Sequence, residues 1–188
     1  SKLLLNSILV FSNKGEESRF KLMFEKIKIL LSRYFIGLTL QILVLFIIYT
    51  VLLVTFEVDN AVAIALICAF LNIVPYLGPM VAGILMALFV ISSNLGADFS
   101  VVILPKLSFV MAGYAIAQLI DNFINQPLIF GKSVRSHPLE IFLIILIAGL
   151  LFGILGMVIA IPVYTAIKVI AKETLSEYKI VKKLTKDL

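Results

Sequence analysis

Long uncharged stretches follow one another along this chain, and their lengths match a lipid bilayer. Residues 35–56 form 22 positions without a charge, roughly 33 Å as a helix, which predicts one complete transmembrane span. A second complete span is predicted over about residues 102–124. We therefore expect an all-α, polytopic integral membrane protein, in which these full transmembrane helices alternate with two interrupted hairpins.

The first predicted hairpin lies between Asp59 and Asp98, where 38 residues carry no charge. This run is about twice the length of a span, and Pro75, Gly78 and Pro79 interrupt its centre. Backbone groups freed by such residues need protein or water as partners, so the break must not face lipid. We expect two short helices over about residues 60–93, and broken helices of this kind often build transporter binding sites.

The second predicted hairpin covers residues 141–167, an uncharged run of 27 positions. It is interrupted by Gly149, Gly153, Gly156 and Pro162. We expect it to enter from the side of the membrane opposite to the first hairpin, which is the pattern of paired discontinuous helices around a midplane site. Close helix packing through small residues is the alternative explanation for these glycines.

The N-terminal region divides into two parts. Residues 1–11 form an apolar piece too short to span a bilayer, and we expect it to be the end of a preceding transmembrane helix. Residues 14–34 have apolar side chains at steps of three and four with basic residues between them, which predicts an amphipathic cytoplasmic helix. That helix lies on the membrane surface, packs against a neighbouring subunit or is a plain extension of the next span.

Composition supports a membrane protein and sets its orientation. Hydrophobic residues make up 62% of the chain and charged residues only 14%, with a mean hydropathy of +1.14, which argues against a soluble domain. Basic residues cluster in residues 14–34, in the 126–137 loop and in the basic tail, residues 175–188, so these segments are predicted to be cytoplasmic. The net charge of +5 thus reflects topology and does not indicate nucleic acid.

The candidate polar path lies at the end of the second span. Gln118, Asp121, Asn122 and Asn125 recur at steps of three and four, so they share a helix face, and Gln126 follows them. An ionisable residue in a membrane helix is treated as functional by default, although Asp121 can instead end the helix at the interface. In the first break, Asn72 and Tyr76 offer further hydrogen-bonding groups.

The loop after this span carries no nucleotide site. Gly131, Lys132 and Ser133 resemble the end of a phosphate-binding loop, but Gln126 occupies the position where that motif requires glycine. His137 is a loop anchor or a proton carrier. The single cysteine, Cys68, allows no intrachain disulfide and is expected to pack in the core.

Several motifs in this order resemble the autoinducer-2 exporter family of bacterial permeases. They are Pro75-Tyr76-Leu77-Gly78-Pro79, Asp121-Asn122-Phe123, Gln126-Pro127, Gly131-Lys132-Ser133-Val134, His137-Pro138-Leu139, Leu151-Phe152-Gly153 and Ala160-Ile161-Pro162. The resemblance implies a transmembrane permease domain over residues 35–174, within a multi-span inner-membrane transporter about twice this length.

The family resemblance implies secondary transport and leaves the cargo open. Some members are credited with export of autoinducer-2, and others with sodium or lithium extrusion in exchange for protons. A small polar solute and a monovalent cation therefore both remain candidates, and a homo-oligomer stays open. We expect no cofactor, no metal and no catalytic residues. The alternative of another class is a membrane scaffold that transports nothing, whose signature would be packing residues without a polar path.

Overall fold

The computed structural model describes residues 14–126 and 137–174, which are helical with short connections and contain no strand. Three of the helical segments, Phe20–Thr55, Phe99–Asn125 and Leu139–Ala171, are long and apolar enough to cross a membrane, and two shorter apolar helices lie between them. The all-α, polytopic membrane architecture predicted from hydropathy is thereby confirmed. The pieces at residues 1–11 and 175–188 lie outside the described residues.

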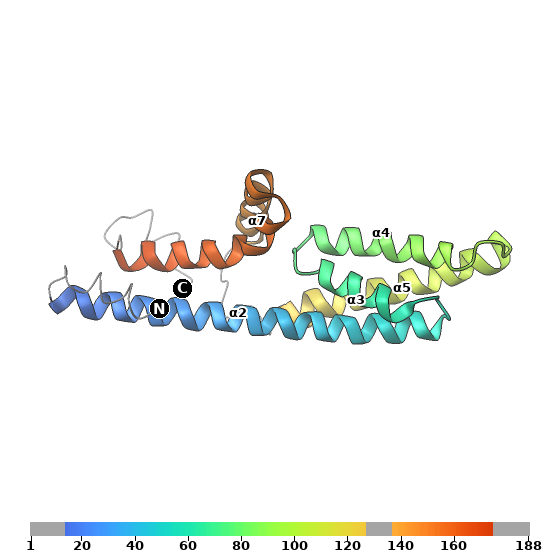
Figure 1. Cartoon of the computed structure of the whole chain (residues 1–188), viewed down its shortest axis with the longest axis horizontal. Helices are drawn as coiled ribbons and strands as arrows, with labels where there is room; N and C mark the ends of the chain where they lie inside the picture. The colour runs from blue at the N-terminus through green and yellow to red at the C-terminus, as the bar shows by residue number, and fades with distance from the viewer. Residues whose placement is uncertain (1–13, 127–136, 175–188) are drawn as a thin grey trace.

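Helix α2 (Lys14–Thr55) is continuous over 42 residues. The segment expected over residues 14–34 is thus a plain extension of the first span. Its apolar side is covered in part, where Met23 and Leu30 pack against Val169 of α7 (Pro138–Thr174). Figure 1 shows α7 beside the N-terminal half of α2, whereas α3, α4 and α5 lie along its C-terminal half.

Helices α3 (Ala61–Leu71) and α4 (Leu77–Ser92) form the predicted first hairpin. Helix α3 has 11 residues, roughly 16 Å, which is too short to cross a hydrocarbon core. Between the two helices, Tyr76 has φ +65°, a conformation that costs free energy for a non-glycine residue. Gly78 follows, and a Cβ atom there would lie 1.9 Å from the Leu71 carbonyl oxygen. The interruption brings the two helices closer together than any larger residue would permit.

The next span is built from three consecutive pieces. A π-helical turn η1 (Phe99–Ile103) leads into α5 (Leu104–Ile120), and a second π-helical turn η2 (Asp121–Asn125) ends it. Asp98 caps the start, since its carboxylate accepts hydrogen bonds from the backbone N–H groups of Ser100 and Val101, each at 2.9 Å. Figure 1 shows α5 running antiparallel to α2.

Helix α7 (Pro138–Thr174) contains the second break. Gly153 has φ +63° and ψ −151°, so the helix stops there and the chain folds back as two arms, residues 138–152 and 154–174. Near the turn the arms approach closely, because a Cβ atom at Gly156 would lie 2.2 Å from the Ala148 carbonyl oxygen. The glycines predicted to interrupt this run therefore also serve close packing.

The main core lies where α2, α3, α4 and α5 meet. Leu45, Tyr49 and Leu53 of α2 are fully buried against small residues of α3. Those small residues are Ala61, Ala65, Cys68 and Ala69. Small side chains let membrane helices approach closely, and Cys68 is one of these packing residues, as expected. Helix α5 packs against α2 and α4, and its polar face meets Tyr49 of α2 and Asn72 at the end of α3.

Candidate functional site

Polar side chains fill part of the space between α2, α3 and the α5–η2 segment. They form two neighbouring groups inside an otherwise apolar bundle, and we call these the carboxylate cluster and the tyrosine cluster. The carboxylate cluster consists of Gln41, Asp121, Asn125 and Gln126, and the tyrosine cluster consists of Tyr49, Asn72, Tyr114 and Gln118. Buried polar groups at membrane depth are rare and are commonly functional.

Asp121 is the centre of the carboxylate cluster and is 0% exposed. Its Oδ2 atom accepts hydrogen bonds from Gln41 Nε2 at 2.8 Å and Gln126 Nε2 at 3.1 Å. Its Oδ1 atom accepts a third bond, from Asn125 Nδ2 at 3.2 Å. Within the described residues these three donors are neutral amides, so the carboxylate is well hydrogen-bonded without a cationic partner. A buried carboxylate in this setting calls for a proton or a small cation to balance its charge.

The π-helical turn explains how two residues of the same segment reach Asp121. In η2 the backbone N–H of Gln126 bonds the Asp121 carbonyl oxygen, five residues earlier. This wider turn places the side chains at positions four and five after Asp121 next to its carboxylate. Turns of this type occur frequently at functional sites. The η2 geometry therefore concentrates donors on a single buried carboxylate.

The tyrosine cluster lies one helical turn before Asp121 along α5. Gln118 Nε2 is 2.7 Å from the Tyr49 hydroxyl, 3.0 Å from Asn72 Oδ1 and 3.1 Å from the Tyr114 hydroxyl. The Gln118 Oε1 atom is buried and has no hydrogen-bond partner among the described residues. A carbonyl oxygen of an amide has two lone pairs, so this atom can accept a hydrogen bond from a further donor.

The first hairpin break is joined to this cluster. The Tyr114 hydroxyl donates to the Pro79 carbonyl oxygen at 2.5 Å, and its ring lies against Gly83, where an added Cβ would be 3.0 Å from a ring carbon. Asn72, the residue that ends α3, is only 3% exposed and donates to the Cys68 carbonyl oxygen at 2.7 Å. The break therefore presents its polar groups to α2 and α5 rather than to lipid.

Not every predicted site residue lies in the two clusters. Tyr76 is 47% exposed, and its ring packs edge-on against Phe142 of α7, with 5.7 Å between ring centres. Asn122 is exposed and accepts a bond from Gln126 Nε2 at 2.9 Å. Pro75 and Gly78 shape the break without joining either cluster.

The predicted loop motif is mostly outside the described residues, which include neither Pro127 nor Gly131, Lys132 and Ser133. His137 is described and exposed, and its Nδ1 atom accepts a bond from the Leu139 N–H at 3.4 Å. This contact lies at the start of α7, which begins at Pro138. The histidine thus accepts a backbone bond at the start of α7, and its role as a loop anchor stays a prediction.

Sequence reasoning missed three members of the two clusters. Gln41, which is 4% exposed, and Tyr49, which is 0% exposed, both come from α2. Tyr114 precedes Gln118 by one turn on α5. A glutamine in the middle of a 22-residue uncharged run was the available signal, because an amide in a membrane helix needs a partner. The partner itself depends on which turns of α2 and α5 meet, and periodicity does not determine that.

A comparison with protein families decides what this arrangement belongs to. The model described as "AI-2E family transporter" matches residues 2–176, which is nearly the whole chain. The chain belongs to the AI-2E transporter family. The family resemblance found in the motifs is thereby confirmed, and both polar clusters lie within the matched residues.

Curated relatives of this AI-2E chain carry names of transport proteins. It is 34% identical to "Putative transport protein YueF" of Bacillus subtilis over 57% of the chain and 27% of that relative. It is 30% identical to "Putative transport protein YrrI" of the same organism over 74% of the chain and 37% of that relative. A 59-residue segment is 41% identical to "Putative permease PerM" of Escherichia coli, which covers 31% of the chain and 17% of that relative.

The matches cover well under two thirds of these relatives, so the AI-2E chain corresponds to only part of their length. No solved structure matches the chain.

Proposed function

We propose that this chain is the pore-forming part of a secondary transporter that moves a small polar solute across the bacterial inner membrane. The observation that carries the proposal is Asp121, a fully buried carboxylate with three neutral amide donors inside an apolar helix bundle. Membership in a transporter family supports it. A scaffold would gain nothing from this arrangement, because buried polar clusters are rarely the most stable way to pack helices.

A solute path along the buried face of α5 is supported by the order of the polar groups. From Tyr114 through Gln118 to Asp121 and Asn125, polar side chains follow every turn of this face. The Gln118 Oε1 atom can accept a hydrogen bond from a hydroxyl or ammonium group of a passing molecule. Autoinducer-2, the cargo named for some family members, belongs to the class of small polar molecules that such a path accommodates.

Cation–proton antiport is the second candidate, and the carboxylate cluster favours it. An antiporter needs one carboxylate that exchanges a proton for a metal ion. The side-chain amides of Gln41, Asn125 and Gln126 can turn about their last bond and present oxygen instead of nitrogen. Sodium or lithium beside Asp121 would then find carboxylate and carbonyl oxygens, which are the ligands that hard cations prefer.

Flux measurements separate these candidates. The intact protein is reconstituted into liposomes with an imposed proton gradient, and uptake of radioactive sodium is compared with release of autoinducer-2. Asp121→Asn removes the charge and keeps the size of the side chain. The matched control is Asp98→Asn, because asparagine also caps a helix and Asp98 is exposed.

The outcomes are distinct. Antiport predicts proton-driven sodium flux that Asp121→Asn abolishes and Asp98→Asn preserves. A solute permease predicts release of autoinducer-2 that needs no sodium. Failure to move either cargo, with the protein folded, would reject this proposal and favour the scaffold.

The proposed orientation places residues 14–34, the 126–137 loop and the C-terminal tail in the cytoplasm. It follows from the distribution of basic residues. With Cys68 replaced by alanine, single cysteines at the exposed positions Asp59 and His137 should react with an impermeant thiol reagent from opposite sides of the membrane. Labelling of both from the same side would reject this topology.

A further inference from the structure

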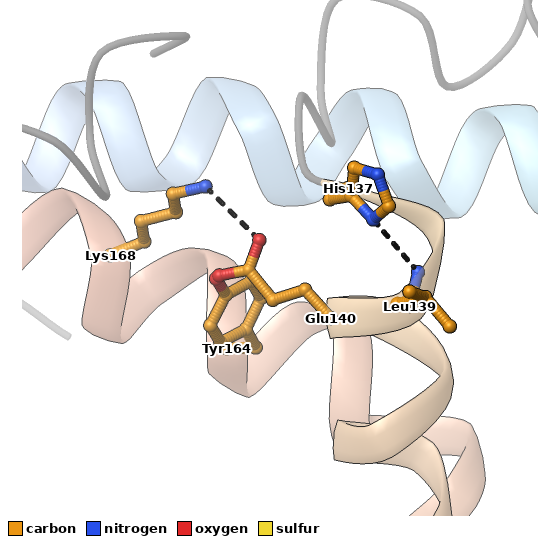
Figure 2. A network of polar contacts seen from close by, with 5 residues as sticks. All are labelled: His137, Leu139, Glu140, Tyr164 and Lys168. Atoms are coloured by element: carbon orange, nitrogen blue, oxygen red, sulfur yellow. Dashed lines mark hydrogen bonds and ion pairs between the residues drawn. The ribbon is translucent and has the colours of Figure 1, made fainter.

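A second buried charge lies in α7, away from both polar clusters. Lys168 is 7% exposed, and its Nζ atom is 3.9 Å from Glu140 Oε2. The Tyr164 hydroxyl donates to Glu140 Oε1, and Lys168 Nζ lies 5.6 Å from the centre of the Tyr164 ring. Figure 2 shows that Glu140 comes from the start of α7 and the other two residues from its later arm. We call these three residues the α7 clasp.

The clasp joins the two arms of α7 through polar side chains. Toward the Gly153 turn, an added Cβ at Gly149 would lie 3.0 Å from Met157 Cγ, so the arms are in contact there. An apolar groove of about 400 Å³ runs along both arms, lined by Ile147, Phe152 and Ile159 among others. The arms are thus held at their two ends, and the clasp is the polar fastening.

The two ends of the hairpin differ in how firmly they are packed. At the clasp end, Ile145 and Ile161 are buried against Tyr34 and Leu38 of α2, and Phe142 contacts Tyr76 at the first break. The turn end is uncovered within the described residues, where Leu150 is 80% exposed and Leu155 is 77% exposed. Any separation of the arms at the clasp end therefore changes contacts on α2, one turn from Gln41.

We propose that the Glu140–Lys168 pair is a charge clasp that keeps the two arms of α7 closed against α2, and that its opening separates the arms next to the Asp121 site. The gating role rests on the proposed transport function, whereas the closure of the arms does not. The buried Lys168 ammonium is stabilised by the nearby Glu140 carboxylate, which is itself 27% exposed. Opening therefore requires that water or a passing ion replace the partner.

Distance measurements between the arms test this clasp. Spin labels are attached to cysteines at Leu139 and Ile167, which are 65% and 57% exposed, in the intact protein with Cys68 replaced by alanine. Glu140→Gln keeps an acceptor for Tyr164 but removes the charge, and Lys168→Met removes the other charge at similar length. The double variant Glu140→Lys/Lys168→Glu restores a pair with reversed polarity.

The matched control is Lys106→Met. Lys106 Nζ donates to Asn94 Oδ1 at 2.9 Å at the start of α5. Its replacement therefore removes a lysine without changing the clasp.

We expect one short, narrow distance distribution in the unmodified clasp and in the Lys106→Met control. Each single clasp variant should raise the long-distance population about tenfold, and the reversed pair should return it to the original level. Unchanged distances in both single variants would overturn the proposal. A reversed pair that stays as open as the single variants would also overturn it, because packing and not charge pairing would then hold the arms.

The distances need no cargo, so this test remains informative when flux fails. A protein that moves neither sodium nor autoinducer-2 but opens in Glu140→Gln retains the clasp and loses the proposed transport function. A protein that transports normally with unchanged distances in both single variants retains transport and loses the clasp.

Discussion

The hydrogen bond between Gln41 and Asp121 gives the sharpest quantitative test of the carboxylate cluster. Gln41 Nε2 lies 2.8 Å from Asp121 Oδ2, both residues are buried, and the two residues are 80 positions apart in the chain. Interhelical hydrogen bonds in membrane proteins contribute about 0.6 kcal/mol on average and rarely exceed about 1.7 kcal/mol. Bonds to a charged acceptor are about twice as strong as neutral ones. We therefore expect a coupling free energy of about 1.2 kcal/mol for this pair, twice the average.

A double-mutant cycle measures that coupling. Gln41→Leu, Asp121→Leu and the double variant are unfolded reversibly by sodium dodecyl sulfate in mixed micelles, with helical content as the signal. The parallel cycle on Tyr49→Phe and Gln118→Leu reports a neutral pair, 2.7 Å apart, for which we expect about 0.6 kcal/mol. Equal coupling energies in the two cycles would refute the argument that a charged carboxylate organises the cluster.

Two further predictions concern the first hairpin. Gly78→Ala should lower the free energy of unfolding by about 3 kcal/mol, because its Cβ would meet the Leu71 carbonyl oxygen at 1.9 Å. Gly83→Ala should lower it by about 1 kcal/mol, because its Cβ would meet a movable ring atom at 3.0 Å. Denaturation in micelles measures both changes, and the reverse order of the two would contradict the packing. Cys68 is fully buried, so its thiol should react with a maleimide at least about a hundredfold more slowly in the folded protein than in denaturant, and equal rates would show that α3 separates readily from α4.

Hydropathy predicted the spans and both interruptions because these features depend only on residues that are neighbours in the sequence. The length of an uncharged run shows whether it can span a bilayer, and Pro75, Gly78 and Gly153 have backbone preferences that interrupt a helix. The same local reasoning placed four residues on one face of the α5–η2 segment, and the structure brings all of them except Asn122 into the polar clusters; the other three are Gln118, Asp121 and Asn125. Local periodicity was enough for a single helix.

What periodicity did not predict depends on two helices at once or on an irregular turn. The pairing of Gln41 with Asp121 requires knowing how α2 and α5 are aligned, and a sequence pattern does not contain that alignment. A regular helix repeats about every 3.6 residues, whereas the wider π-helical turn brings Gln126, five residues after Asp121, next to that carboxylate. Asn122 is left exposed. Tyr76 was expected near Asn72, but its positive φ directs its ring toward α7.

The carboxylates of Asp121, which is buried, and Glu140, which is partly exposed, have opposite surroundings, and the difference bears on function. Glu140 accepts a hydrogen bond from the Tyr164 hydroxyl and lies 3.9 Å from Lys168, a fixed positive charge. Asp121 faces three amides, each of which can exchange donor for acceptor by rotating its end group. Lysine already balances the charge of the Glu140 carboxylate. Amides that can present either nitrogen or oxygen can instead hydrogen-bond Asp121 as a free carboxylate, as a protonated acid or beside a cation. This contrast is why we assign the exchangeable site to Asp121 and the structural fastening to Glu140.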